Sequence, residues 1–293
     1  RKHLYGKKYL PKPIIFIMSE IKFLNKLFNN KFLKFINIIL SFIAIVYLFN
    51  LIIESKIDID ISSFINMVYV FPFFLVSNYL IANGISKLSI EEHRNTIRAS
   101  WFASMLGKYI PFKIGIPLLR FGHIKENIRS FSNSKILRDL VLEQIAILLM
   151  ALTVGSIYFI ANQQFQFILI LVIFIFSLIS LKTTKTDRFL FLSNTLLSQI
   201  FIVIGIYFFI NLTYQEANLT LVLGYILSAS ISLVFIGSPA GIGIREYIAV
   251  LLFSNNFDQN FVLELIISLR ILTVFMDLFS YLGYFIYKKI NSL

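Results

Sequence analysis

Two short segments, Pro111-Phe112-Lys113-Ile114-Gly115-Ile116 and Pro239-Ala240-Gly241-Ile242-Gly243-Ile244, share the pattern P-x-x-I-G-I and lie 128 positions apart. Each lies inside an apolar stretch that would otherwise be predicted as one continuous helix. Proline removes a backbone N–H donor and glycine permits positive φ, so each segment should break the helix and reverse the chain. We therefore expect two helical hairpins, whose tips contain Pro111 and Gly115 in the first and Pro239, Gly241 and Gly243 in the second.

The arm before each tip carries a small residue at every fourth position. These residues are Thr96, Ser100 and Ser104 in the first arm and, after the same shift of 128, Gly224, Ser228 and Ser232 in the second. Such spacing lets helix backbones approach closely inside a membrane. The pattern therefore indicates that both arms pack tightly against other helices.

The composition is that of a polytopic, all-α membrane protein. The chain has 293 residues, of which 58% are hydrophobic, a mean hydropathy of +0.81 and several apolar runs near the roughly 20 residues that cross a bilayer. It contains no cysteine, which excludes disulfides, thiol nucleophiles and cysteine-ligated metals, and its three histidines lie far apart in polar stretches. Without a P-loop pattern either, we expect no ATP hydrolysis, no metal and no cofactor.

A net charge of +12 permits two interpretations, binding of nucleic acid or the excess of basic residues that cytoplasmic loops carry. The second is favoured, because all of the 27 Lys and Arg except Lys56, Arg245 and Arg270 fall in segments that the topology below places on one side. Residues 1–34 then form a basic cytoplasmic arm against anionic head groups. We expect a multi-pass protein of the plasma (inner) membrane with both termini cytoplasmic and no nucleic-acid partner.

About six full spans are predicted, at residues 35–53, 64–82, 136–160, 165–181, 189–211 and 261–287. The hairpins at 96–130 and 219–253 have arms too short to span comfortably and are interpreted as re-entrant, which requires their tips to be buried in protein or to line a wet cavity.

The spans repeat with the same shift as the tips. Moving the first three spans by 128 positions reproduces the last three within three residues, so residues 35–160 and 161–293 form two repeats. An odd number of spans in each repeat turns the second upside down. Inverted repeats of this kind are typical of secondary transporters, whose sites lie near the midplane at helices broken by Gly or Pro.

Charged residues at depth are the candidate site, because a charge at the bilayer centre costs about 2.5–3.5 kcal/mol and usually faces protein or water. Arg120 and Arg245 are favoured as ligands of a phosphate group, since each follows a tip near the positive end of a helix and offers a planar donor fork. The further substrate-binding candidates are Lys108, Lys113 and Glu246. Alternatively, Arg245 pairs with Glu246 or Asp277, and Arg120 and Lys113 extend to the cytoplasmic surface.

Three more buried charges are candidates for an ion pair or for proton coupling. Glu143 falls near the repeat counterpart of Arg270, so the two are expected to pair if they pack together. Arg270 and Asp277 lie seven positions apart on one helix face. A structural ion pair is favoured over a coupling role for all three.

The tips and their flanks resemble the membrane region of bacterial lysylphosphatidylglycerol synthases and the free-standing, flippase-like membrane proteins related to them. The residues that carry the resemblance are Gly107-Lys108-Tyr109-Ile110-Pro111 with Lys113, Gly115 and Arg120, and Pro239-Ala240-Gly241-Ile242-Gly243-Ile244-Arg245-Glu246. Span order and tip placement extend it to residues 35–287. Phe112 and Ala240 depart from it, because the family usually has glycine after the proline.

The resemblance implies a membrane domain that moves lipids or lipid-linked sugars between leaflets. Its aminoacyl-transferring members carry a soluble catalytic domain after the membrane region, and with the sequence ending at Leu293 that activity is not expected here. The expected partners are a membrane phospholipid or polyprenyl-linked lipid, with envelope-biosynthesis enzymes and a second copy of the chain as further candidates.

Three functions therefore stay open, of which translocation of an anionic lipid or lipid-linked sugar is favoured. A membrane-embedded glycosyl- or phosphotransferase would need carboxylates at the lipid–water boundary, and Glu54, Asp58 and Asp60 form the one such cluster. A non-transporting scaffold for an envelope-glycan synthase is the third. No catalytic motif is present, so we do not expect an enzyme.

Overall fold

The computed structural model describes residues 61–109, 115–128, 130–162, 185–215, 218–234, 244–253 and 256–290. These parts of the chain form eight α-helices and two short 3₁₀ helices and contain no strand, which confirms the all-helical class. The predicted basic arm, the first and fourth spans and most of both tips lie outside the described residues. Among the predicted site residues, this applies to Pro111, Lys113, Pro239, Gly241 and Gly243.

Four long helices form the body of the protein. They are α3 (Ile61–Lys87), α6 (Asn133–Ala161), α8 (Lys185–Tyr214) and α11 (Gln259–Ile290). Among the described residues, α3, α6 and α8 are long and apolar enough to cross a membrane, so a membrane protein is supported. All four correspond to predicted spans and extend beyond them at both ends, because polar residues at the borders continue the helix past the apolar run.

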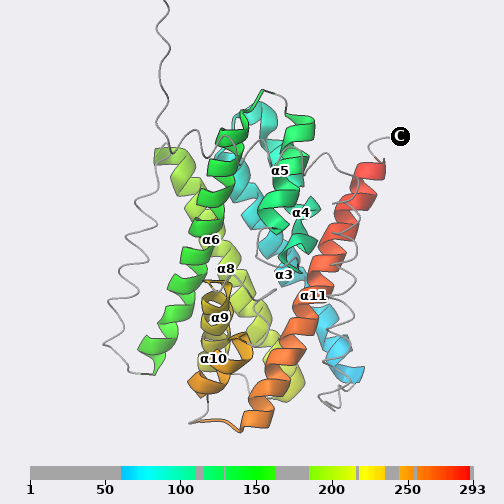
Figure 1. The fold of residues 1–293 in the computed structure, drawn as a ribbon. Helices are drawn as coiled ribbons and strands as arrows, with labels where there is room; N and C mark the ends of the chain where they lie inside the picture. The colour runs from blue at the N-terminus through cyan, green and yellow to red at the C-terminus, as the bar shows by residue number, and fades with distance from the viewer. Residues whose placement is uncertain are drawn as a thin grey trace, which may run out of the picture.

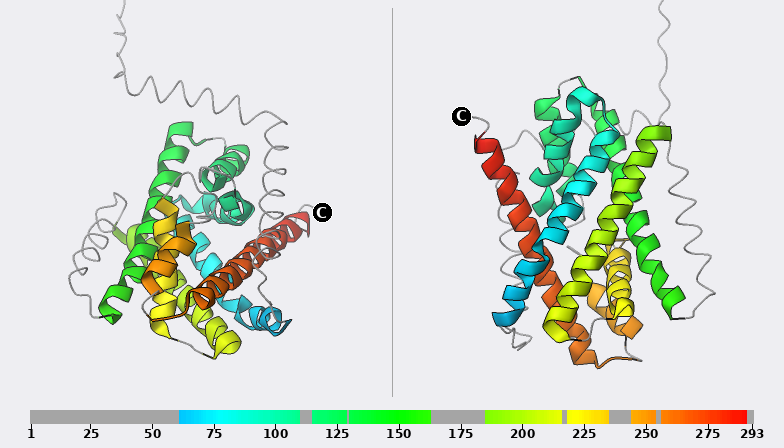
Figure 2. Two further views of the ribbon diagram at one scale, coloured as in Figure 1. Left: turned by 60° about the horizontal axis from the view of Figure 1, so that its bottom comes forward. Right: turned by 180° about the vertical axis from the view of Figure 1, so that it is seen from behind.

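The shorter helices form two hairpins at opposite ends of the bundle (Figure 1). One contains the 3₁₀ helix η1 (Glu91–His93), α4 (Arg94–Ala103), the 3₁₀ helix η2 (Met105–Tyr109) and α5 (Gly115–Asn127). The other contains α9 (Leu219–Val234) and α10 (Ile244–Phe253). The view from behind shows the same separation of α4 and α5 from α9 and α10 (Figure 2).

The first arm of the first hairpin is not one helix over residues 96–110, as predicted, because α4 ends at Ala103 and the chain continues as η2. The hydroxyls of Ser100 and Ser104 donate to the carbonyls of Ile97 and Trp101, at 2.6 and 2.8 Å, which competes with regular helix geometry. A Cβ on Gly107 would lie 2.6 Å from the backbone of Gly115, so the two arms touch backbone to backbone here.

Small residues also set the spacing between the helices. The most extensive contact joins α3 to α8, where the hydroxyls of Ser77 and Ser198 lie 3.0 Å apart. The next most extensive joins α6 to α9, where a Cβ on Gly155 would lie 2.8 Å from the backbone of Leu227. In α9, Gly224 leaves room for the ring of Phe253 from the other arm of its hairpin. The second hairpin is therefore packed against α6 at backbone distance.

Replacing Gly155 with alanine tests this contact. Because the new methyl group meets the backbone of α9 rather than a flexible side chain, we expect the free energy of unfolding to fall by about 1–3 kcal/mol. Chemical unfolding in detergent micelles, followed by circular dichroism, measures the change. Gly122→Ala in α5 is the matched control, since nothing lies within 4 Å of its Cβ position and it should not destabilise. Equal losses in both variants would contradict the close α6–α9 crossing.

Candidate functional site

Arg120 of α5 and Glu143 of α6 form an ion pair in the interior of the protein, with 2.5 Å between Nη1 and Oε2. The Arg120 side chain has no exposed surface. Its Nε donates to the hydroxyl of Ser100 at 3.3 Å, and its guanidinium lies 5.7 Å from the ring centre of Trp101, so α4 also contacts the pair. The alternative that Arg120 extends to the cytoplasmic surface is therefore wrong.

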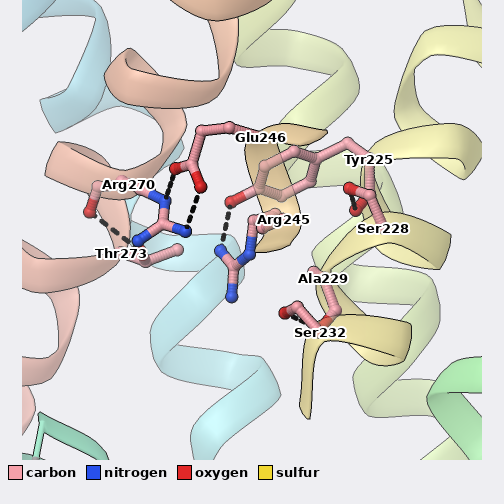
Figure 3. Close-up of polar contacts among 8 residues, drawn as sticks. All are labelled: Tyr225, Ser228, Ala229, Ser232, Arg245, Glu246, Arg270 and Thr273. Atoms are coloured by element: carbon pink, nitrogen blue, oxygen red, sulfur yellow. Dashed lines mark hydrogen bonds and ion pairs between the residues drawn. The ribbon is translucent and has the colours of Figure 1, made fainter. Parts of the chain in front are cut away.

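Glu246 and Arg270 form a second buried pair, between α10 and α11. Both guanidinium–carboxylate contacts are made, with Nε to Oε1 at 2.5 Å and Nη2 to Oε2 at 3.0 Å (Figure 3). The pair therefore combines one charge-assisted hydrogen bond with a second close contact between opposite charges. The pair fixes the first turn of α10 to the middle of α11.

Arg245, the neighbour of Glu246, contacts the opposite arm of the same hairpin. Its Nη1 donates to the hydroxyl of Tyr225 in α9 at 3.1 Å, and its guanidinium lies 5.6 Å from the centre of that ring. Figure 3 shows the Arg245 guanidinium beside the Glu246–Arg270 pair and not within it. Two consecutive residues of α10 thus face different partners, Glu246 toward α11 and Arg245 toward α9.

Asp277 of α11 holds the end of η2 in the first hairpin. The Tyr109 hydroxyl donates to Oδ2 of Asp277 at 2.5 Å, and the Lys108 ammonium forms an ion pair with the same oxygen. Asp277 is buried, whereas about a third of the Lys108 side chain is exposed. The first hairpin is therefore attached to α11 as the second is, two helical turns further along.

These contacts form one group, which we call the central cluster: Lys108, Tyr109, Tyr225, Arg245, Glu246, Arg270 and Asp277. Its parts are electrostatically connected, because Arg245 interacts through its charge with Tyr109, Asp277 and Arg270. It contains three cations and two carboxylates, so it carries a net positive charge. Residues of both hairpins and of α11 thus meet at one site, of which the sequence predicted Lys108, Arg245, Glu246, Arg270 and Asp277.

The predicted pairing of Glu143 with Arg270 is wrong, because each pairs within its own half of the chain. The two observed pairs are spaced almost equally, 23 residues for Arg120 and Glu143 and 24 for Glu246 and Arg270. Each joins the second arm of a hairpin to the long helix that follows it. The charges are exchanged, however, since the arginine lies on the hairpin in the first pair and on the long helix in the second.

The sequence analysis did not identify the two aromatic residues whose rings lie beside the arginines. Trp101 precedes Arg120 by 19 positions and Tyr225 precedes Arg245 by 20, each on the first arm of its hairpin. This shared spacing was a usable signal, because it places an aromatic ring and an arginine on facing arms in both halves.

The chemistry of the central cluster suits an anion better than a metal. Among the described residues no group of three or more His, Cys, Asp or Glu could hold a metal ion. The cluster instead offers guanidinium and ammonium donors and a phenol hydroxyl, the groups that bind phosphate. Comparisons with protein-family models, curated proteins and solved structures found no match, so the resemblance stated above stays a prediction.

Replacing Glu143 with glutamine should leave the Arg120 guanidinium buried without a counter-charge. We expect the free energy of unfolding to fall by about 3–5 kcal/mol, the usual effect of removing one partner of a buried pair. Asp139→Asn, one turn earlier on α6, removes an exposed partner of Arg138 and should change stability by less than about 1 kcal/mol. Chemical unfolding in micelles measures both changes. Similar losses of unfolding free energy at the two sites would show that the Arg120–Glu143 pair stabilises the protein no more than an exposed pair does.

Proposed function

We propose that the chain is an inverted repeat with six spans and two re-entrant hairpins. The helix directions support this. In Figure 1, α3 runs up and α6 runs down around the hairpin at the upper end, whereas α8 runs down and α11 runs up around the hairpin at the lower end. The ion pairs also support it, because a pair joins α5 to α6 and another joins α10 to α11 at corresponding places, with the arginine and the glutamate on opposite helices in the two halves. Such repeats carry their binding sites where the broken helices meet.

The distribution of charge supports an orientation with the α4–α5 end in the cytoplasm. Basic residues gather at this end, among them Lys87, Arg94, Lys135, Arg188 and Lys288. By contrast, no Lys or Arg occurs among the described residues in the ranges 61–86, 139–162, 189–215, 218–234 and 247–269, which include the opposite end of the bundle. By the positive-inside rule, both termini then lie on the cytoplasmic side of the plasma membrane.

The proposed activity is translocation of an anionic lipid or lipid-linked sugar between leaflets. The observation that carries it is that both hairpins attach to one face of α11 in a partly buried cluster with net positive charge. Buried charges inside a membrane protein are costly and mark substrate pathways. A phosphate head group would balance the net positive charge of the cluster, with Arg245 and Lys108 as its first contacts.

The geometry also supports a way for the site to change access. Lys108 and Tyr109 belong to the first repeat, and Arg245, Glu246, Arg270 and Asp277 to the second, so the cluster lies on the boundary between them. Rocking of one repeat against the other would open this boundary first to one side and then to the other. Arg120 takes no part in this proposal, because its completely buried pair with Glu143 favours a structural role.

The orientation can be tested by cysteine labelling, which is simple in a chain without cysteine. Ser134→Cys lies at the α4–α5 end and Asn256→Cys at the opposite end, and both positions are exposed. In intact cells, a membrane-impermeant maleimide should label Asn256→Cys alone, whereas permeabilised cells should label both variants. Labelling of Ser134→Cys in intact cells, or of both variants on one side, would contradict the proposed topology.

Transport can be tested in proteoliposomes that contain fluorescent phosphatidylglycerol, by quenching the outer leaflet with dithionite. We expect the native chain to move the lipid and Arg245→Ala to slow its movement at least about tenfold, because the variant removes the guanidinium donor fork proposed to contact the phosphate. Arg138→Ala, which removes an exposed arginine from α6, is the matched control and should transport normally. The same movement by protein-free vesicles or by Arg245→Ala would reject the site, and lipid-sugar product formation would favour the transferase.

A further inference from the structure

Asp277 holds the first hairpin through a single oxygen atom. Its Oδ2 accepts the Tyr109 hydrogen bond and contacts the Lys108 ammonium, so two consecutive residues of η2 share one acceptor on α11. The Asp277 side chain is 4% exposed and that of Lys108 is 35% exposed. The carboxylate is thus enclosed, while its cationic partner reaches the surface of the cluster.

We propose that Asp277 is a built-in competitor for the anionic ligand. The inference rests on the proposed function and adds the ligand class, a head group with a phosphate ester. A phosphate oxygen accepts the same donors as Oδ2 of Asp277 and carries the same sign of charge. Because Lys108 is partly exposed, its ammonium can turn to an arriving phosphate without first exposing the carboxylate.

When a phosphate takes Lys108 away from Asp277, the charge of the Asp277 carboxylate is still compensated. The charged and titratable groups that face it are Lys108 and Tyr109 from η2 and Arg245 from α10, which interacts with it electrostatically. When Lys108 turns to the ligand, Arg245, the other contact of the phosphate, remains a nearby cation that interacts electrostatically with Asp277. A buried charge with a nearby partner costs far less than an isolated one.

The exchange would couple binding to movement of the first hairpin. In the structure described here, Lys108 and Tyr109 attach η2 to α11. Once the ligand accepts from Lys108 and Tyr109, these two contacts with Asp277 are lost, whereas the Glu246–Arg270 ion pair still fixes the second hairpin to the same helix. The ligand therefore releases one repeat and not the other, which is what alternating access between two repeats requires.

The test measures binding of dihexanoyl phosphatidylglycerol to the full chain in a non-ionic detergent by isothermal titration calorimetry, with dihexanoyl phosphatidylcholine as the reference lipid. Asp277→Asn should bind phosphatidylglycerol about tenfold more tightly than the native chain, because the amide no longer competes for Lys108. Asp277→Glu, which keeps a carboxylate, should stay near the native affinity. In a Lys108→Ala background the gain from Asp277→Asn should disappear. Asp139→Asn is the charge-matched control.

Unchanged or weaker binding by Asp277→Asn, together with loss of binding in Arg245→Ala, would overturn the competitor role and leave the proposed anion site intact. Equal binding of both lipids by the native chain and by all variants would overturn the anion site itself. Hydrogen–deuterium exchange of the native chain gives a readout that needs no folded variant. Phosphatidylglycerol should increase exchange in residues 105–109, and unchanged or slower exchange there would overturn the release of η2.

Discussion

The buried ion pair between the second arm of each hairpin and the long helix after it is the interaction on which the structure depends. With 13 and 10 residues, α5 and α10 are too short to be stable as isolated helices. Arg120 with Glu143 and Glu246 with Arg270 attach them to α6 and α11 in the interior, where water cannot replace a lost partner. Each pair therefore fixes both the depth of its hairpin and the direction that the hairpin faces.

The exchange of charges between the two pairs explains why the halves are not equivalent. In the first half, Arg120 both lies over the ring of Trp101 and pairs with Glu143. In the second half these roles fall to consecutive residues, since Glu246 forms the pair and Arg245 lies over Tyr225. The second half thus gains one cation beside its ion pair. With this cation, the formal charge of the central cluster is positive.

Hydropathy and the spacing of Pro and Gly were enough to predict the helices, because those signals are local. The second hairpin at 219–253 matches α9 and α10, and the four described spans match long helices. Which charged residues pair with each other, by contrast, depends on contacts between helices that are distant in the sequence. Repeat symmetry relates Glu143 to Arg270 as corresponding positions, and corresponding positions lie on different helices of the two halves, so they need not touch. The contact of Lys108 with Asp277 joins residues from different halves of the chain, and no spacing rule connects them.

Exposure separates a pair that supports the fold from one that can exchange partners. The Arg120 side chain is 0% exposed and is enclosed by Glu143, Ser100 and Trp101, so a ligand reaches it only if the first hairpin opens. Lys108 carries the same charge at 35% exposure and faces a carboxylate that Arg245 also faces. An ion pair of the first kind must stay closed for the hairpin to hold its place. One of the second kind can open at a lower cost, and for that reason we propose exchange with an anion at α11 and not at α6.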